Sequence, residues 1–257
     1  MYRQLRLDFS DRICTVTLDR PERRNAFSAE LMREMIDCAH ALSRRSELDV
    51  VIVTGGRDFF SAGADLKDTT RWAGGRQLLE QREIAALGGR MTRAWEELPQ
   101  ITIAAIEGYA VGGGFAFCVA LDWRVMARNA FVSFPEISLG IPLTWGTLPR
   151  LVNLAGPAKA KRLSILGERV SGEQALAMGL VDEVCDAGKC MERAGALAAM
   201  VLEKPKHSVL MTKESVNAYA GLGAHAVSYM APDQLELAAA SPESRAAREA
   251  ALKRRKT

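Results

Sequence analysis

Two short glycine-bearing segments follow the two most apolar strands that the sequence predicts. The continuous β-branched runs Val50–Thr54 and Ile101–Ile106 suit strands that are buried on both faces of a sheet. The first run is followed by residues 60–66 (FSAGADL), and the second by residues 107–115 (EGYAVGGGF). Because predicted strands alternate with predicted helices through this part of the chain, we expect an α/β fold with these segments at strand-to-helix turns.

The other expected elements divide the chain into two parts. A β-hairpin is predicted from Leu5 to Leu18, followed by a helix with Ser28 as its N-cap. From Asp68 to Leu98 we expect helices around a mobile loop, broken at Gly74-Gly75 and again at Gly88-Gly89. Further on we expect a helix opened by residues 112–114, strands at 123–126 and 181–184, and helices at 158–166 and 171–178. Helix-forming residues dominate from Cys190, so we expect an α/β body over residues 1–200 and a helical part over residues 201–257.

Charge and composition exclude several classes of function. The formal net charge of +3 gives no reason to expect a nucleic-acid partner. The longest apolar stretch, Tyr109–Leu121, is too short to span a bilayer, and the first residues lack the apolar core of a signal peptide. The five cysteines show no paired spacing, and all but Cys190 lie among apolar neighbours. We therefore expect reduced core cysteines, a cytoplasmic location and no membrane partner.

The common catalytic motifs built on metals, phosphates or nucleophilic serine are absent from the sequence. The three histidines fall in helical stretches away from both glycine-bearing segments. We therefore expect neither a metal site nor a serine–histidine nucleophile.

Small residues at a strand-to-helix turn leave backbone N–H groups uncovered, and the N-terminus of a helix adds partial positive charge. Two such turns side by side could direct two N–H donors at one oxygen and form an oxyanion hole. The alternative is that these glycines only permit tight turns and close packing. Glycine spacing by itself leaves both interpretations open.

Five motifs together resemble the crotonase (enoyl-CoA hydratase/isomerase) superfamily, in its order and near its spacings. They are RPERRNA at 20–26, SAGADL at 61–66, GYAVGGG at 108–114, FPEISLG at 134–140 and ALAMGLV at 175–181. The resemblance implies a spiral of ββα units with a helical C-terminal trimerisation region, assembled as a homotrimer or a dimer of trimers. It also implies an acyl-CoA thioester substrate, with coenzyme A present only as part of that substrate and no separate cofactor.

The same resemblance assigns roles to residues. The backbone N–H groups of Ala64 and Gly113 would form the oxyanion hole, with Glu136 as a catalytic acid and base. The remaining substrate-binding residues would be Arg24, Asn25, Ala26, Ala62, Gly63, Asp65, Leu66, Tyr109, Gly112 and Trp145. Of these, Asp65 is more readily interpreted as a helix cap, and Trp145 would line or narrow the acyl pocket or simply pack in the core.

One position departs from the hydratases of the family, which hold a water between two glutamates. The glutamate expected two residues after the glycine triplet is replaced by Ala116, which leaves Glu136 alone. One carboxylate is enough to move a proton from C2 to C4 of a 3-enoyl thioester, so the sequence favours an enoyl-CoA isomerase. Thr144 stands where dienoyl-CoA isomerases resembling this chain carry an aspartate, which argues against that reaction.

Two alternatives stay open. The first is an enoyl-CoA hydratase in which another group replaces the missing carboxylate. The second is a non-catalytic acyl-CoA-binding protein that has kept the oxyanion fold.

Overall fold

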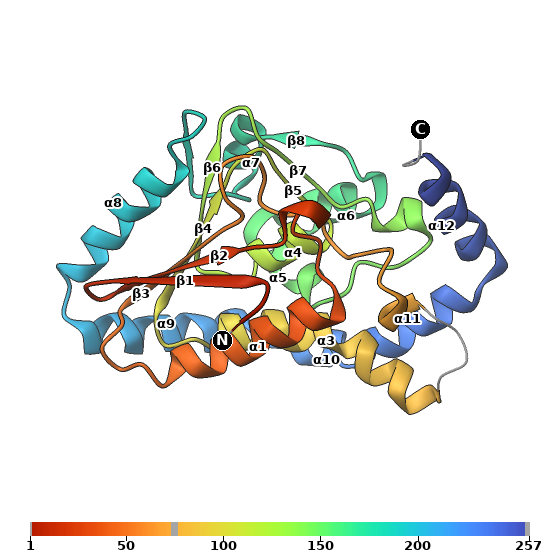
Figure 1. Ribbon diagram of the computed structural model, residues 1–257, viewed down its shortest axis with the longest axis horizontal. Helices are drawn as coiled ribbons and strands as arrows, with labels where there is room; N and C mark the ends of the chain where they lie inside the picture. Colours follow the sequence, from red (N-terminus) through yellow and green to blue (C-terminus); the bar gives the residue numbers. More distant parts are fainter. Residues whose placement is uncertain (1, 73–76, 255–257) are drawn as a thin grey trace.

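The structure is a computed structural model that describes residues 2–72 and 77–254. A six-stranded sheet has the order β1-β2-β3-β4-β6-β9, and a smaller sheet has the order β5-β7-β8 (Figure 1). The strands are β1 Leu5–Ser10, β2 Ile13–Leu18, β3 Val50–Thr54, β4 Ile101–Ile106, β5 Tyr109–Val111, β6 Trp123–Ala127, β7 Phe131–Ser133, β8 Val170–Ser171 and β9 Glu183–Cys185.

The larger sheet is parallel from β2 to β9, and only β1 runs antiparallel to its neighbour. Every residue of β3 and β4 is buried, as the apolar runs predict. The two strands pair in register from Val50 opposite Ile101 to Thr54 opposite Ala105. Both strands therefore end at the same edge of the sheet and at the same level. This brings together the turns that follow them.

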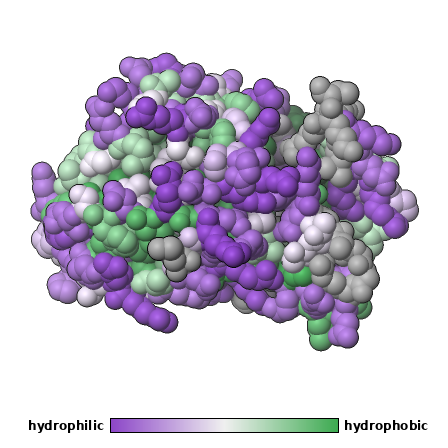
Figure 2. Space-filling model, in the orientation of Figure 1, coloured by the Kyte–Doolittle hydropathy of each residue, from purple (hydrophilic) through white to green (hydrophobic). Residues whose placement is uncertain are grey.

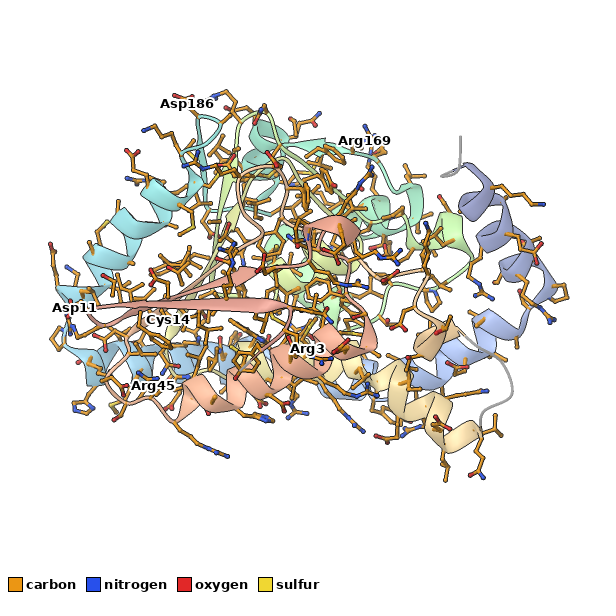
Figure 3. The ribbon with its side chains drawn as sticks, in the orientation of Figure 1. Arg3, Asp11, Cys14, Arg45, Arg169 and Asp186 are labelled. Carbon is orange, nitrogen blue, oxygen red and sulfur yellow. The ribbon has the colours of Figure 1, made fainter. Side chains whose placement is uncertain are left out.

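The sheet is covered by helices and has one apolar outer surface at its N-terminal hairpin. The helices of the body are α1 Ala29–Ser43, α2 Thr69–Trp72, α3 Leu78–Glu96, α4 Gly113–Cys118, α5 Thr147–Ala155, α6 Pro157–Leu166, α7 Gly172–Met178 and α8 Cys190–Leu202, with the short 3₁₀ helices η1 Pro21–Arg23 and η2 Glu136–Leu139. Figure 2 shows apolar surface over the β1–β2 hairpin, where Phe9 is exposed. Arg45, labelled below the hairpin in Figure 3, lies over the Phe9 ring with its guanidinium carbon 4.6 Å from the ring centroid.

Most of the expected elements are confirmed. The hairpin, the buried strands and the helix that opens at Gly113 lie where the sequence predicts them. Ser28 caps α1, since its hydroxyl accepts the N–H of Leu31 at 3.1 Å. The last strand begins at Glu183 instead of Val181, and the short strands of the smaller sheet carry no clear sequence pattern.

The expected break at Gly88-Gly89 is wrong, because α3 runs through both glycines without interruption. Gly88 instead makes room for a neighbour: a Cβ atom there would lie 1.9 Å from Nε1 of Trp145. The other expected break, at Gly74-Gly75, lies outside the described residues.

The cysteines differ from expectation in one respect. Cys190 is fully buried and Cys185 is the half-buried one, with the two sulfur atoms 3.5 Å apart. Burial raises the pKa of the Cys14 and Cys38 thiols to about 12, which suits inert core residues.

The C-terminal helices lie along the body of their own chain (Figure 1). They are α9 Lys206–Ala220, α10 Ala224–Ser228, α11 Ala231–Ala240 and α12 Pro242–Arg254. Helix α11 packs on α3, where Arg82 pairs with Asp233 at 2.9 Å, and α12 packs on η2. The expected division at residue 200 falls within α8, and the trimer and the cytoplasmic location stay predictions. None of the helices in the described ranges is long and apolar enough to cross a membrane.

A buried ion pair fastens α9 to the sheet. Nζ of Lys213 lies 2.6 Å from Oδ2 of Asp122 and donates to the carbonyl of Gln100 at 2.7 Å. The Lys213 side chain is only 4% exposed, and burial lowers the pKa of its ammonium group. Asp122 also accepts the backbone N–H and the hydroxyl of Thr102. This carboxylate therefore joins α9 and β4 to the segment that precedes β6.

Replacing Asp122 with asparagine is expected to lower the free energy of unfolding by about 3–5 kcal/mol, because a buried ammonium loses its negative partner. Urea unfolding followed by circular dichroism at fixed protein concentration measures the change. The matched control is Glu97→Gln, which breaks the exposed Arg93–Glu97 pair and should cost less than about 1 kcal/mol. Equal effects of the two substitutions would contradict the proposed role of the buried pair.

Candidate active site

The two glycine-bearing turns are joined by backbone hydrogen bonds. The carbonyl of Tyr109 accepts the N–H groups of Phe60 at 2.9 Å and Ser61 at 3.2 Å. In return, the carbonyl of Ser61 accepts the N–H of Val111 at 3.0 Å. These bonds form an isolated bridge between Ser61 and Ala110 of β5 and fix one turn against the other.

The approach of the turns requires glycine. Gly63 has φ +90°, and a Cβ atom there would lie 2.5 Å from the carbonyl oxygen of Val111 and 3.3 Å from the nitrogen of Gly113. A Cβ atom on Gly113 would lie 3.3 Å from the nitrogen of Ala64. Within residues 2–72 and 77–254, neither the Ala64 nor the Gly113 N–H has a hydrogen-bond acceptor. Two adjoining uncommitted amides of this kind can bind one oxygen atom.

The Arg24–Ala26 stretch runs beside the first turn. The carbonyl of Arg24 accepts the N–H of Ala62 at 3.0 Å. The carbonyl of Gly63 accepts the N–H of Phe27 at 2.7 Å. Arg24 and Asn25 both have positive φ, near 50°, so the chain bends sharply here. The buried Asn25 side chain holds the bend, because its amide donates to the carbonyls of Gly55 and Phe60.

Ser61 is a site residue that the motif analysis did not single out. Its buried hydroxyl donates to the carbonyl of Asn25 at 2.7 Å and accepts the N–H of Gly63 at 3.1 Å. The buried Ser61 hydroxyl therefore joins the bend at Asn25 to the first glycine-bearing turn at Gly63. Its position between Phe60 and Ala62 gave no signal of this role.

Asp65 is not a helix cap, because α2 begins only at Thr69. Its carboxylate pairs with Arg20 at 2.8 Å and accepts the N–H of Lys67 at 2.9 Å. Arg20 also donates to the carbonyl of Ala26 at 2.8 Å. The pair thus fastens the bend to the residue after Ala64. Its partner stands 45 positions away in the sequence, and no local pattern indicated it.

Glu136 reaches the second turn from η2. The smaller sheet carries it there, because the N–H of Gly112 donates to the carbonyl of Ser133 at 2.8 Å. A Cβ atom on Gly112 would lie 2.5 Å from Oε1 of Glu136, so the carboxylate lies against the residue that precedes Gly113. Oε2 of the same carboxylate is buried.

Ala116 lies in α4 one turn after Gly112, whose carbonyl accepts its N–H at 2.8 Å, and it is 1% exposed. The structure therefore places the Glu136 carboxylate beside Gly112 and the Ala116 methyl group one helical turn later. Thr144 lies just before α5, where its carbonyl accepts the N–H of Thr147.

The remaining predicted residues lie at the margins of this arrangement. Leu66 is half-buried in the turn after Asp65. The Tyr109 ring stacks between Phe59 and Phe131, with centroid distances of 5.5 and 5.7 Å, while its carbonyl supports the turns. Trp145 is buried, with its ring against Gly113. Among the residues described, no group of three or more histidine, cysteine or acidic side chains is placed to hold a metal ion.

Comparison with known proteins identifies the family. The family described as enoyl-CoA hydratase/isomerase matches residues 8–256, so the chain belongs to it and is an enzyme of the crotonase superfamily. A Mycobacterium avium protein named "Probable enoyl-CoA hydratase echA17" is 35% identical over 194 residues, which cover 76% of this chain and 74% of the relative.

One further relative supports the same family, and one solved structure supports the fold. The short-chain-enoyl-CoA hydratase of Clostridium acetobutylicum is 31% identical over 212 residues, covering 82% of this chain and 80% of the relative. The crystal structure of an enoyl-CoA hydratase from Mycobacterium avium subsp. paratuberculosis has the same fold, with a TM-score of 0.88 and 24% identity over 99% of this chain and 97% of that one. The expected crotonase fold is thereby confirmed.

Replacing Gly63 with alanine is expected to destabilise the protein by about 1–3 kcal/mol, because the new Cβ meets the Val111 carbonyl in a strained backbone conformation. Thermal unfolding measures the change. Gly195→Ala is the matched control, since nothing lies within 4 Å of its Cβ position in α8. That substitution should stabilise the protein by about 0.5–1 kcal/mol through helix propensity. If Gly63→Ala stabilises the protein as well, the close approach of the turns is wrong.

Proposed function

We propose that this protein isomerises the double bond of enoyl-CoA thioesters. The observation that carries the proposal is the pairing of two uncommitted amides, at Ala64 and Gly113, with one carboxylate, Glu136, against Gly112. Ala116 occupies the position where hydratases resembling this chain carry a second glutamate. The residues at hand thus suit proton transfer better than the addition of water.

In the proposed reaction, the thioester oxygen of a 3-enoyl-CoA accepts hydrogen bonds from the Ala64 and Gly113 amides. Glu136 removes a proton from C2, and the electron pair moves onto the thioester oxygen to give a dienolate. The two amides stabilise that negative charge, and donors of this kind contribute about 3 kcal/mol each in comparable sites. Glu136 then returns the proton at C4, which yields the 2-enoyl isomer with no net gain or loss of atoms.

The coenzyme A portion is proposed to lie along the bend and the first turn. Exposed Arg24 and half-buried Ala62 and Leu66 provide this surface, while Asn25, Ala26 and Gly63 are buried beneath it. Arg24 offers a cation to a phosphate group. Coenzyme A enters and leaves with the substrate, so the reaction needs no separate cofactor.

Hydration is the second candidate, because the Mycobacterium and Clostridium relatives are named as enoyl-CoA hydratases. It would require a group other than residue 116 to orient the water beside Glu136.

Incubation with 2-enoyl-CoA and 3-enoyl-CoA panels separates these functions by product mass. Isomerisation leaves the mass unchanged and moves the double bond, whereas hydration adds one water. Binding without any turnover would support the non-catalytic alternative. An acyl-CoA that binds the folded state should also raise the melting temperature.

Glu136→Gln is expected to lower turnover of 3-enoyl-CoA by about 10²–10⁴-fold, because the amide side chain cannot accept the C2 proton. Affinity for acyl-CoA should persist, since the proposed oxyanion donors are backbone amides. Steady-state kinetics and acyl-CoA titration measure the two effects separately.

The control is Glu97→Gln, an equal change at an exposed residue of the body, which should leave kcat unaltered. A Glu136→Gln variant that isomerises 3-enoyl-CoA as fast as the parent would refute the proposed mechanism. Ala116→Glu supplies the complementary variant, in which hydration of 2-enoyl-CoA is sought.

A further inference from the structure

The indole ring of Trp145 fills a space that two glycines leave open. A Cβ atom on Gly88 of α3 would lie 1.9 Å from its Nε1 atom, and one on Gly113 of α4 would lie 2.5 Å from its Cη2 and Cζ3 atoms. The ring therefore extends from α3 to the start of α4. Any residue other than glycine at either contact would displace it.

The ring is held firmly in this position. The Trp145 carbonyl accepts the Thr92 hydroxyl at 2.7 Å and the Arg150 guanidinium at 2.9 Å. Arg150 is fixed in turn by a two-fold ion pair with Glu96, at 2.7 and 2.8 Å. Phe27 meets the indole edge to face at a centroid distance of 5.9 Å. These contacts retain Trp145 at φ +60°, a conformation that tryptophan adopts only when its surroundings impose it.

The ring lies next to the place of the reacting atoms. The Cβ position of Gly113 is 2.5 Å from the ring edge and 3.3 Å from the Ala64 nitrogen, so those two atoms are no more than about 6 Å apart. Glu136 stands on the neighbouring residue, Gly112. A thioester whose oxygen reaches both amides therefore lies beside the indole.

A cavity of about 840 Å³ also borders Trp145. It is lined from α3 by residues such as Ala85, Ala86 and Gly89, and from the C-terminal helices by residues such as Tyr229. Ala64, Gly113 and Glu136 do not line it. Trp145 thus has the amide pair near its ring edge and also borders an open volume.

We propose that Trp145 is the wall that limits the acyl chain to short lengths, by closing the way from the thioester site to this cavity. The inference rests on the proposed function only in taking the amide pair as the thioester site. On this proposal a short acyl chain lies beside the indole, whereas longer chains need the space that the ring occupies. Each CH₂ group excluded from an apolar pocket lowers affinity appreciably, so the preference should grow with chain length.

The test measures binding of saturated, unreactive butanoyl-, octanoyl- and dodecanoyl-CoA by calorimetric titration. The parent should bind butanoyl-CoA best. Trp145→Ala should raise the affinity for octanoyl-CoA relative to butanoyl-CoA at least tenfold. Trp145→Phe keeps most of the packing and should shift the ratio in the same direction by a smaller factor.

Trp123→Phe is the matched control, since Trp123 is half-buried in β6 and does not line this cavity. It should leave the ratio unchanged. If Trp145→Ala does not fold, Trp145→Phe decides the question alone. An unchanged ratio in the folded Trp145 variants, or a parent that already prefers dodecanoyl-CoA, would overturn the proposal. Because these ligands do not react, a protein that binds them without turning over any enoyl-CoA refutes only the proposed isomerisation.

Discussion

The arrangement of the site depends on the in-register parallel pairing of β3 with β4. Because Thr54 lies opposite Ala105, both strands leave the sheet at one level, and the turns after them meet. Backbone bonds between Ser61 and the Tyr109–Val111 strand then hold the two turns together. A shift of one residue in this register would separate the Ala64 and Gly113 amides by roughly 3 Å, the rise of one strand residue.

Glycine shapes the site by leaving space for specific neighbours. Gly63 admits the Val111 carbonyl, Gly112 admits the Glu136 carboxylate, and Gly113 together with Gly88 admits the Trp145 ring. Gly88 sits in a helix interior, where glycine costs about 1 kcal/mol relative to alanine. Burial of the Trp145 indole offsets that cost, because a larger residue at position 88 would occupy the space of the ring.

Membership of the crotonase superfamily and the chemistry of this particular site are separate matters. The family accounts for the fold, and the paired amides are backbone atoms of that fold. The proposed reaction depends on the side chains around them, which here are the carboxylate of Glu136, the methyl group of Ala116 and the indole of Trp145. The buried pair of Arg20 and Asp65 takes no part in the proposed proton transfer, but it fastens the bend beside the amides.

Local patterns in the sequence determined the hairpin, the buried strands, the Ser28 cap and the two turns, because each rests on residues that are neighbours in the chain. The motif order also determined the family. Tertiary structure decided what local patterns could not: α3 continues through Gly88-Gly89 because a ring from a distant loop packs there, and Asp65 serves Arg20 instead of a helix. It also decided that α11 and α12 return to their own α3 and η2. These features depend on contacts between residues more than 40 positions apart, for which a single sequence carries no periodic signal.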